Sequence, residues 1–192
     1  RGREIALLVL TGIDFTGEDP ERAFERFMAE FIVGPEVADT FGEERPASTF
    51  ERYREAFLQG QEIADFQVLS EPVLSFRELR EGVAAEPAMG EFARVLVRGV
   101  AARREEIDAL IAEASEHWRL DRMPVVDRNL LRLATYELIA TPDVPTGVVL
   151  NEAIDLARTF GTEASPAFVN GVLDRVAAHV ASRDREARRT SP

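Results

Sequence analysis

Three consecutive segments decide the fold of this chain: PVVDRNLLRLATYELIA (124–140), PTGVVLNEAIDLARTF (145–160) and PAFVNGVLDRVAAHV (166–180). In each of them apolar residues recur at spacings of three and four, which is the period of an amphipathic helix. Each segment also opens with a proline, which fits the first turn of a helix because its missing N–H would have no partner there. The stretch therefore predicts three successive helices.

The residues between these segments indicate where the helices begin and end. Thr141-Pro142 stops the first helix, because the residue before a proline avoids the helical conformation. Gly161 stands where a left-handed cap is expected after the second helix. Ser165 is expected to cap the third helix, with Pro166 as its first residue.

The helical period also extends upstream. An apolar stripe predicts either one long helix or two abutting helices, with a core formed by Phe92, Val95, Leu96, Gly99, Val100, Ile107, Leu110, Ile111 and Ala114. Nearer the N-terminus, a first helix ends between Gly12 and Gly17, and Asp19-Pro20 opens a second helix that Gly34-Pro35 stops. No segment alternates as a strand would, apart from a weak rival in GVVL at 147–150. We therefore predict an all-α fold.

The composition excludes several classes of protein. The 192 residues include no cysteine, which rules out disulfides and thiolate chemistry and fits a cytoplasmic protein. No apolar run reaches the roughly 20 residues that a membrane-spanning helix needs. The two histidines, His117 and His179, lack the spacing of a metal site or of a catalytic constellation. We therefore expect no membrane segment, no metal, no cofactor and no catalysis.

The net charge of −12 is unevenly distributed along the chain. Residues 13–91 hold 19 Asp and Glu against 7 Arg, whereas the remainder holds 16 acidic residues against 16 Arg. Phosphate binding relies on basic side chains, and every basic residue here is Arg, which suits bidentate phosphate contacts. The overall acidity therefore does not exclude nucleic-acid binding outside the acidic stretch.

Two long runs carry a resemblance to a known family. HWRLDRMPVVDRNLLRLATYEL (117–138) and DVPTGVVLNEAIDLARTFGTEASPAFVNGVLDRV (143–176) resemble the C-terminal half of the NusB family in order and nearly in spacing. FARVLVRGVAARREEIDALI (92–111) and REIALLVL (3–10) resemble its earlier helices. These segments cover a little under half of the chain, and the residues at about 34–75 are identified as an insertion without a family counterpart.

The resemblance implies a NusB-like fold of two helical subdomains with an inserted acidic, partly helical segment. We expect an N-terminal subdomain at 1–91 that includes the insertion, a C-terminal subdomain at 92–182 and a flexible tail at 183–192. Family members act in transcription antitermination. They bind a boxA-type RNA together with NusE, a small-subunit ribosomal protein, and the pair helps RNA polymerase transcribe ribosomal RNA operons. Some members form homodimers, so self-association stays open.

The family's binding residues can be carried over position by position. For RNA they are Arg1 and Arg3 in the first helix and Phe168 near the start of the last helix, where an exposed aromatic ring stacks an unpaired base. Phe168 is equally explained as a core anchor. For the protein partner the best match is Asp127, with Arg128, Arg132 and Glu137 on the same helix. A solvated helix face explains those charges as well.

Three positions depart from the family pattern. Thr11 replaces an aromatic residue, Ala164 an acidic one and Ala167 a basic one. These departures favour an alternative to RNA binding: a NusB paralogue with weakened or lost RNA affinity that serves as an adaptor between proteins. A third hypothesis, an accessory domain of an RNA methyltransferase, ranks last because we find no methyltransferase sequence here.

Overall fold

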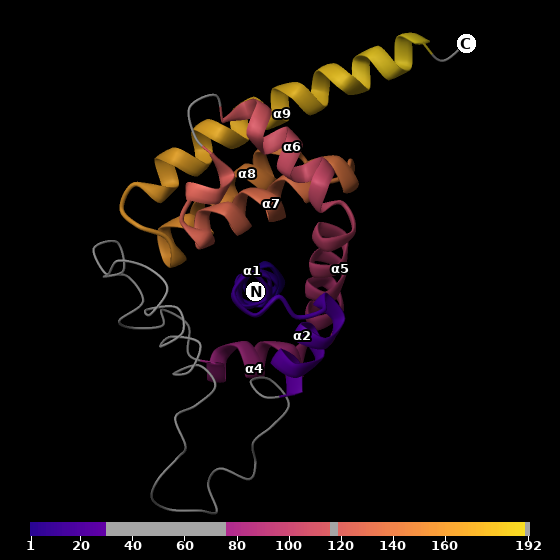
Figure 1. Cartoon of the computed structure of the whole chain (residues 1–192). Helices are drawn as coiled ribbons and strands as arrows, with labels where there is room; N and C mark the ends of the chain where they lie inside the picture. Colours follow the sequence, from indigo (N-terminus) through magenta and orange to yellow (C-terminus); the bar gives the residue numbers. More distant parts are fainter. Residues whose placement is uncertain (30–75, 116–118, 191–192) are drawn as a thin grey trace, which may run out of the picture. The chain divides into compact units, whose positions relative to one another are not determined.

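The computed structural model of the chain describes residues 1–29, 76–115 and 119–190 (Figure 1). Its α-helices are α1 (Gly2–Thr16), α2 (Pro20–Phe27), α4 (Phe76–Ala85), α5 (Ala88–Ala102), α6 (Arg104–Ala114), α7 (Val125–Ala140), α8 (Thr146–Phe160) and α9 (Ser165–Thr190), with a short 3-10 helix, η4 (Leu120–Arg122). The described ranges contain no strand, and the all-α prediction is confirmed. The predicted stop at Gly34-Pro35 and the segment at about 34–75 lie outside them.

The chain divides into two compact units, Arg1–Val97 and Arg98–Pro192. In the first unit α1 packs against α2, and both predicted boundaries between them are present. Gly17 ends α1 with a φ of 65°, and Asp19 caps α2 by accepting hydrogen bonds from the backbone N–H groups of Glu21 and Arg22. These local hydrogen bonds fix where α1 stops and where α2 starts.

The second unit is built around α7. This helix packs against α6, α8 and α9, and α9 also packs against α6 and α8. Leu130, Leu131 and Leu133 of α7 are each exposed by 2% or less, although they point in different directions around the helix. A helix that is buried on most of its circumference keeps no solvated face. The polar side chains of α7 therefore need partners inside the protein.

The stripe predicted upstream of α7 forms two helices and differs from the prediction on α5. Arg103 leaves the helical conformation, with φ −115° and ψ 21°, and so separates α5 from α6. Phe92 and Val95 were expected in the core but are 37% and 55% exposed. Ala93 and Val97 are buried instead, while Leu96 and Val100 are buried as predicted. The predicted stripe and the one that is buried both have helical spacing and share Leu96 and Val100, so periodicity could not distinguish them.

The last helix is longer than expected. The helical pattern predicted from the sequence reaches only Val180, whereas α9 continues as a helix to Thr190. Figure 1 shows this C-terminal part of α9 extending beyond the other helices of its unit. Among the helices of the described ranges, none is long and apolar enough to cross a membrane.

A buried ion pair joins α7 to α6. The guanidinium of Arg132 donates from Nε to Oδ1 of Asp108 at 2.7 Å and from Nη2 to Oδ2 at 2.9 Å, and Nη1 donates to Oδ1 of Asn129 at 3.2 Å. The Arg132 side chain is only 6% exposed, whereas that of Asp108 is 30% exposed. Without the Asp108 carboxylate, the buried positive charge of Arg132 would lose its counter-charge. Such a loss costs more stability than the loss of a surface ion pair.

We therefore predict that Asp108→Ala lowers the free energy of unfolding by on the order of 3 kcal/mol. The matched control is Asp155→Ala, because Asp155 forms an exposed pair with Arg158 and should cost about 0.5 kcal/mol or less. Urea denaturation of both variants measures the difference. Equal losses would show that the Asp108–Arg132 pair contributes no more than a surface pair.

Candidate nucleic-acid and partner interfaces

In the first unit, one of the two predicted RNA-binding arginines lies beside an exposed aromatic ring. Arg1 precedes α1, and its side chain is 42% exposed, 3.7 Å from the Glu4 carboxylate. The guanidinium carbon of Arg3 lies 5.4 Å from the centre of the Phe92 ring, within cation–π range. Phe92 was assigned to the core from the sequence, so the structure adds it to the candidate site.

Gly2 allows α1 and α5 to approach closely beside Arg3 and Phe92. The residue is buried, and a methyl group added to it would lie 2.7 Å from the Phe92 ring and 3.1 Å from the Met89 carbonyl oxygen. The first turn of α1 can therefore lie directly on the first turn of α5 only because position 2 has no side chain. This close approach holds Arg3 over Phe92 and presents a cationic and aromatic surface.

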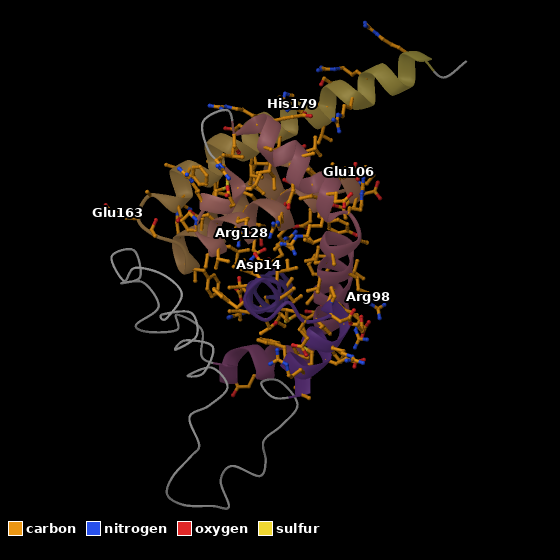
Figure 2. All side chains as sticks on the ribbon, viewed as in Figure 1. Asp14, Arg98, Glu106, Arg128, Glu163 and His179 are labelled. Atoms are coloured by element: carbon orange, nitrogen blue, oxygen red, sulfur yellow. The ribbon has the colours of Figure 1, made fainter. Side chains whose placement is uncertain are left out.

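In the second unit, the turn between α8 and α9 leads to Phe168, which is half-buried on the first turn of α9. The exposed Glu163 marks this turn in Figure 2. Ala164 and Ala167, two of the three departures from the family pattern, are exposed beside it. An aromatic side chain at this position contributes both to the packing of α9 and to the surface.

Two expectations about this turn are wrong in detail. Gly161 does not adopt a left-handed cap: its φ is −95° and its ψ −170°, which is extended backbone. A methyl group there would lie 2.5 Å from the Ser165 Cβ and 2.7 Å from the Ala157 carbonyl oxygen. Glycine is needed for space, and its conformational freedom is not used. Ser165 is the first residue of α9 rather than its cap, and its hydroxyl accepts the Thr162 N–H at 2.8 Å.

The four predicted partner residues of α7 differ in their exposure. Asp127, Arg132 and Glu137 are buried, whereas Arg128 is half-buried and donates from Nη1 to the carbonyl of Leu120 in η4 at 3.3 Å. Figure 2 labels Arg128 on α7. The sequence grouped these residues because they share one helix, but the structure gives each of them a different surrounding.

Asp127 is buried near the N-terminus of α7. Its Oδ1 has no hydrogen-bond partner among the described residues. Burial raises the pKa of Asp127 above its ordinary value of 3.8, and the Ser165 hydrogen bond offsets part of that rise. The site therefore holds a carboxyl group whose ionised form is disfavoured by its surroundings.

The potential metal ligands of the described residues are dispersed. No three His, Cys, Asp or Glu side chains gather there as a metal site would require. His179 is exposed on α9, and His117 lies outside the described residues.

Comparisons with known proteins place this architecture in a family. The described helices define an all-α protein whose second unit packs α6, α8 and α9 around a central α7. A sequence model of the NusB family matches residues 62–178, which is more than half of the chain. The chain belongs to the NusB family.

Individual relatives agree with this assignment. The transcription antitermination protein NusB of Myxococcus xanthus is 55% identical over 92 residues, which are 48% of this chain and 66% of that protein. Its counterpart in an Anaeromyxobacter species is 61% identical over 88 residues, which are 46% of this chain and 61% of that protein. The chain thus matches less than two thirds of the length of these relatives.

Solved structures share the fold. The solution structure of NusB from Aquifex aeolicus covers 95% of this chain and 88% of its own, with a TM-score of 0.59 and 23% identity. A crystal structure of the antitermination factors NusB and NusE in complex with double-stranded RNA covers 93% of this chain and 94% of the matched chain, with a TM-score of 0.58 and 23% identity. At this identity the likeness concerns the fold alone.

Gly161→Ala is expected to destabilise the protein, and Gly171→Ala to stabilise it. At position 161 the new methyl group meets backbone and Ser165, and such overpacking costs about 1–3 kcal/mol. Gly171 is exposed within α9, where a methyl group meets no described atom and alanine favours the helix by about 1 kcal/mol. Thermal and urea unfolding of the two variants show whether each substitution raises or lowers the stability. A stabilising Gly161→Ala would contradict the steric role of that glycine.

The raised pKa of Asp127 predicts how the stability of the protein depends on pH. The folded protein favours the protonated carboxyl, so its stability should fall as the pH rises from near 3.8 through the raised pKa and then level off. Asp127→Asn removes this titration. The unfolding free energy of the wild type, measured relative to Asp127→Asn by urea denaturation, should therefore decline across that window.

Ser165→Ala provides a second check on the cause. It removes the hydrogen bond that lowers the pKa of Asp127, so the decline should extend to higher pH in this variant. A difference between wild type and Asp127→Asn that does not change with pH would show that Asp127 titrates alike in the folded and unfolded protein.

Proposed function

We propose that this chain is an RNA-binding adaptor of transcription antitermination, which binds boxA-type RNA together with a NusE-type ribosomal protein and supports ribosomal RNA transcription. The observation that carries the proposal is the match to the NusB family over residues 62–178. It would act in the cytoplasm as part of an RNA polymerase antitermination complex, by binding and without a chemical step.

The cluster of Arg1, Arg3 and Phe92 supports the RNA-binding part of the proposal. Arginine neutralises phosphate charge, and aromatic rings stack unpaired bases in a way that tolerates different sequences. Phe168 in the second unit offers another aromatic ring beside an exposed turn. All four side chains lie outside the strongly acidic stretch at 13–91, which Phe92 directly follows.

The second unit is the proposed site for the protein partner. Arg128 is its most accessible candidate, because Asp127, Arg132 and Glu137 are buried. One of the structures with the same fold contains NusB bound to NusE and RNA, which supports the combination of a protein surface and an RNA surface on this fold. If RNA and partner each favour the other's binding, the coupling must be equal in both directions.

The test is the binding of a labelled boxA-type RNA, with and without purified NusE, across a series of salt concentrations. We expect salt-sensitive binding that NusE strengthens. Arg3→Ala should lower the slope of log affinity against log salt by about one, because one phosphate contact is lost. Phe168→Ala should weaken binding by about 1–3 kcal/mol, or roughly 5- to 150-fold.

Arg158→Ala is the matched control for charge. Arg158 is exposed on α8 and paired with Asp155, so its loss should leave the RNA affinity and the salt slope unchanged. If the wild type binds no RNA with or without NusE but still binds NusE, the RNA part of the proposal fails and the chain is an adaptor between proteins. If it binds neither, the antitermination function is rejected.

A further inference from the structure

The end of α9 forms a basic extension, defined here as residues 181–190. Figure 1 shows it beyond the other helices of its unit, and Figure 2 shows nitrogen-tipped side chains along it. Residues 183–189 hold four Arg against two acidic residues, whereas the rest of the chain holds 19 Arg against 33. The match to the NusB family ends at residue 178. The extension is therefore a positively charged segment of an acidic chain, and it lies beyond the part that the family match covers.

Two contacts with α6 anchor the base of the extension. Arg175 Nη1 donates to the carbonyl oxygen of Ala114, the last residue of α6, at 3.0 Å. Arg183 Nη2 lies 3.9 Å from Oε2 of Glu113. Beyond this point Arg185 and Arg189 are exposed, and neither forms an ion pair with another described side chain. The extension thus starts from a fixed place on its unit and presents these two guanidinium groups to the surroundings.

Two ordinary roles of arginine in helices explain most of these residues. A cation in the last turn of a helix is stabilised by the helix dipole, which accounts for Arg188 and Arg189 because α9 ends at Thr190. An acidic residue three or four positions away offers an ion pair along the helix, and Arg183 has Glu186 at that spacing. These three arginines therefore do not require an external ligand.

Arg185 is explained by neither role. It lies before the last turn, and the effect of the helix dipole falls off within that turn. The positions three and four residues away on either side are Ala181, Ser182, Arg188 and Arg189. None of them is acidic, and like charges at these spacings destabilise a helix. An external anion would relieve this repulsion, so Arg185 and its two basic neighbours form a site that favours one.

The composition of the extension favours nucleic acid over protein as the source of that anion. Protein interfaces depend on a few large anchors such as Trp and Tyr, and the apolar residues of the extension are only Ala181 and Ala187. Arginine binds phosphate through two parallel hydrogen bonds. From Arg183 to Arg189 the helix rises by about 9 Å. That length matches three to four phosphates of one strand at roughly 3.4 Å each.

We propose that the extension of α9 is a second, sequence-independent RNA contact, which binds the phosphate backbone of nucleotides flanking the boxA-type element through Arg185 and Arg189. This inference rests on the proposed function, because that function brings RNA to Phe168 at the other end of α9. Along the helix axis Phe168 and Arg185 lie about 25 Å apart. Roughly seven nucleotides span that length at about 3.4 Å per phosphate. The contact therefore adds affinity only for RNA that continues beyond the element.

The test compares two labelled RNAs across a series of salt concentrations. Both contain a boxA-type element, and one continues on each side with about 15 uridines, which is more than enough to span 25 Å at roughly 3.4 Å per phosphate. The wild type should bind the longer RNA more tightly and with a steeper dependence on salt. Arg185→Gln/Arg189→Gln should lower the slope of log affinity against log salt by about 1.4 on the longer RNA, because each single-strand phosphate contact contributes about 0.7. Binding of the shorter RNA should not change.

Arg119→Gln/Arg158→Gln is the matched control for net charge. It removes two exposed arginines of the same unit, which pair with Asp121 and Asp155, and it should leave the salt slope unchanged on both RNAs. Equal decreases in the two double variants would reflect a diffuse effect of net charge and would overturn the proposal. Equal binding of the shorter and the longer RNA by the wild type would also overturn it, while the proposed function would stand.

A longer RNA with a scrambled boxA element separates this inference from the proposed function. If the wild type binds it as well as the intact RNA, and the salt slope still depends on Arg185 and Arg189, the boxA function fails and the phosphate contact stands. If the wild type binds neither RNA, both are rejected. NusE affinity and the free energy of unfolding should be unchanged in Arg185→Gln/Arg189→Gln, because glutamine keeps the helix propensity of arginine. A loss of NusE affinity with RNA binding unchanged would make the extension a protein contact and reject the inference.

Discussion

The second unit depends on the burial of α7 and on the partners that this burial demands. A helix packed against α6, α8 and α9 excludes water from most of its circumference, yet its sequence carries Asp127, Asn129 and Arg132. Two of these polar groups form a network that reaches a neighbouring element: Arg132 pairs with Asp108 of α6 and also donates to Asn129 within α7. The apolar residues provide the stability of the unit, and the buried polar residues specify how its helices are placed.

The parts of the fold that local chemistry determines were predictable from the sequence. Gly17 and Asp19-Pro20 end one helix and begin the next, because capping requires only residues within one turn. The prolines at 124 and 145 likewise precede α7 and α8 directly. The family resemblance agreed with these boundaries and identified the family, since the matching motifs fall on the three C-terminal helices.

The candidate sites were less predictable, because they depend on contacts between distant segments. Phe92 and Ala93 both lie on stripes of helical spacing, and only the packing shows that the smaller residue is inside. Asp127 was matched to a partner contact by its position in a motif, which carries no information about burial. The importance of Ser165 to this carboxylate involves residues on two helices, and no spacing in the sequence indicates it.

The extended conformation of Gly161 has a consequence for the entropy of folding. Glycine has more backbone freedom in the unfolded chain than any other residue, so fixing it in one conformation costs more entropy. At many glycines that cost can be reduced by substitution with alanine, which restricts the unfolded chain. At position 161 the contact with Ser165 and Ala157 forbids the substitution. The compact turn before α9 therefore carries an entropic cost that a larger residue could lower only by separating α8 from α9.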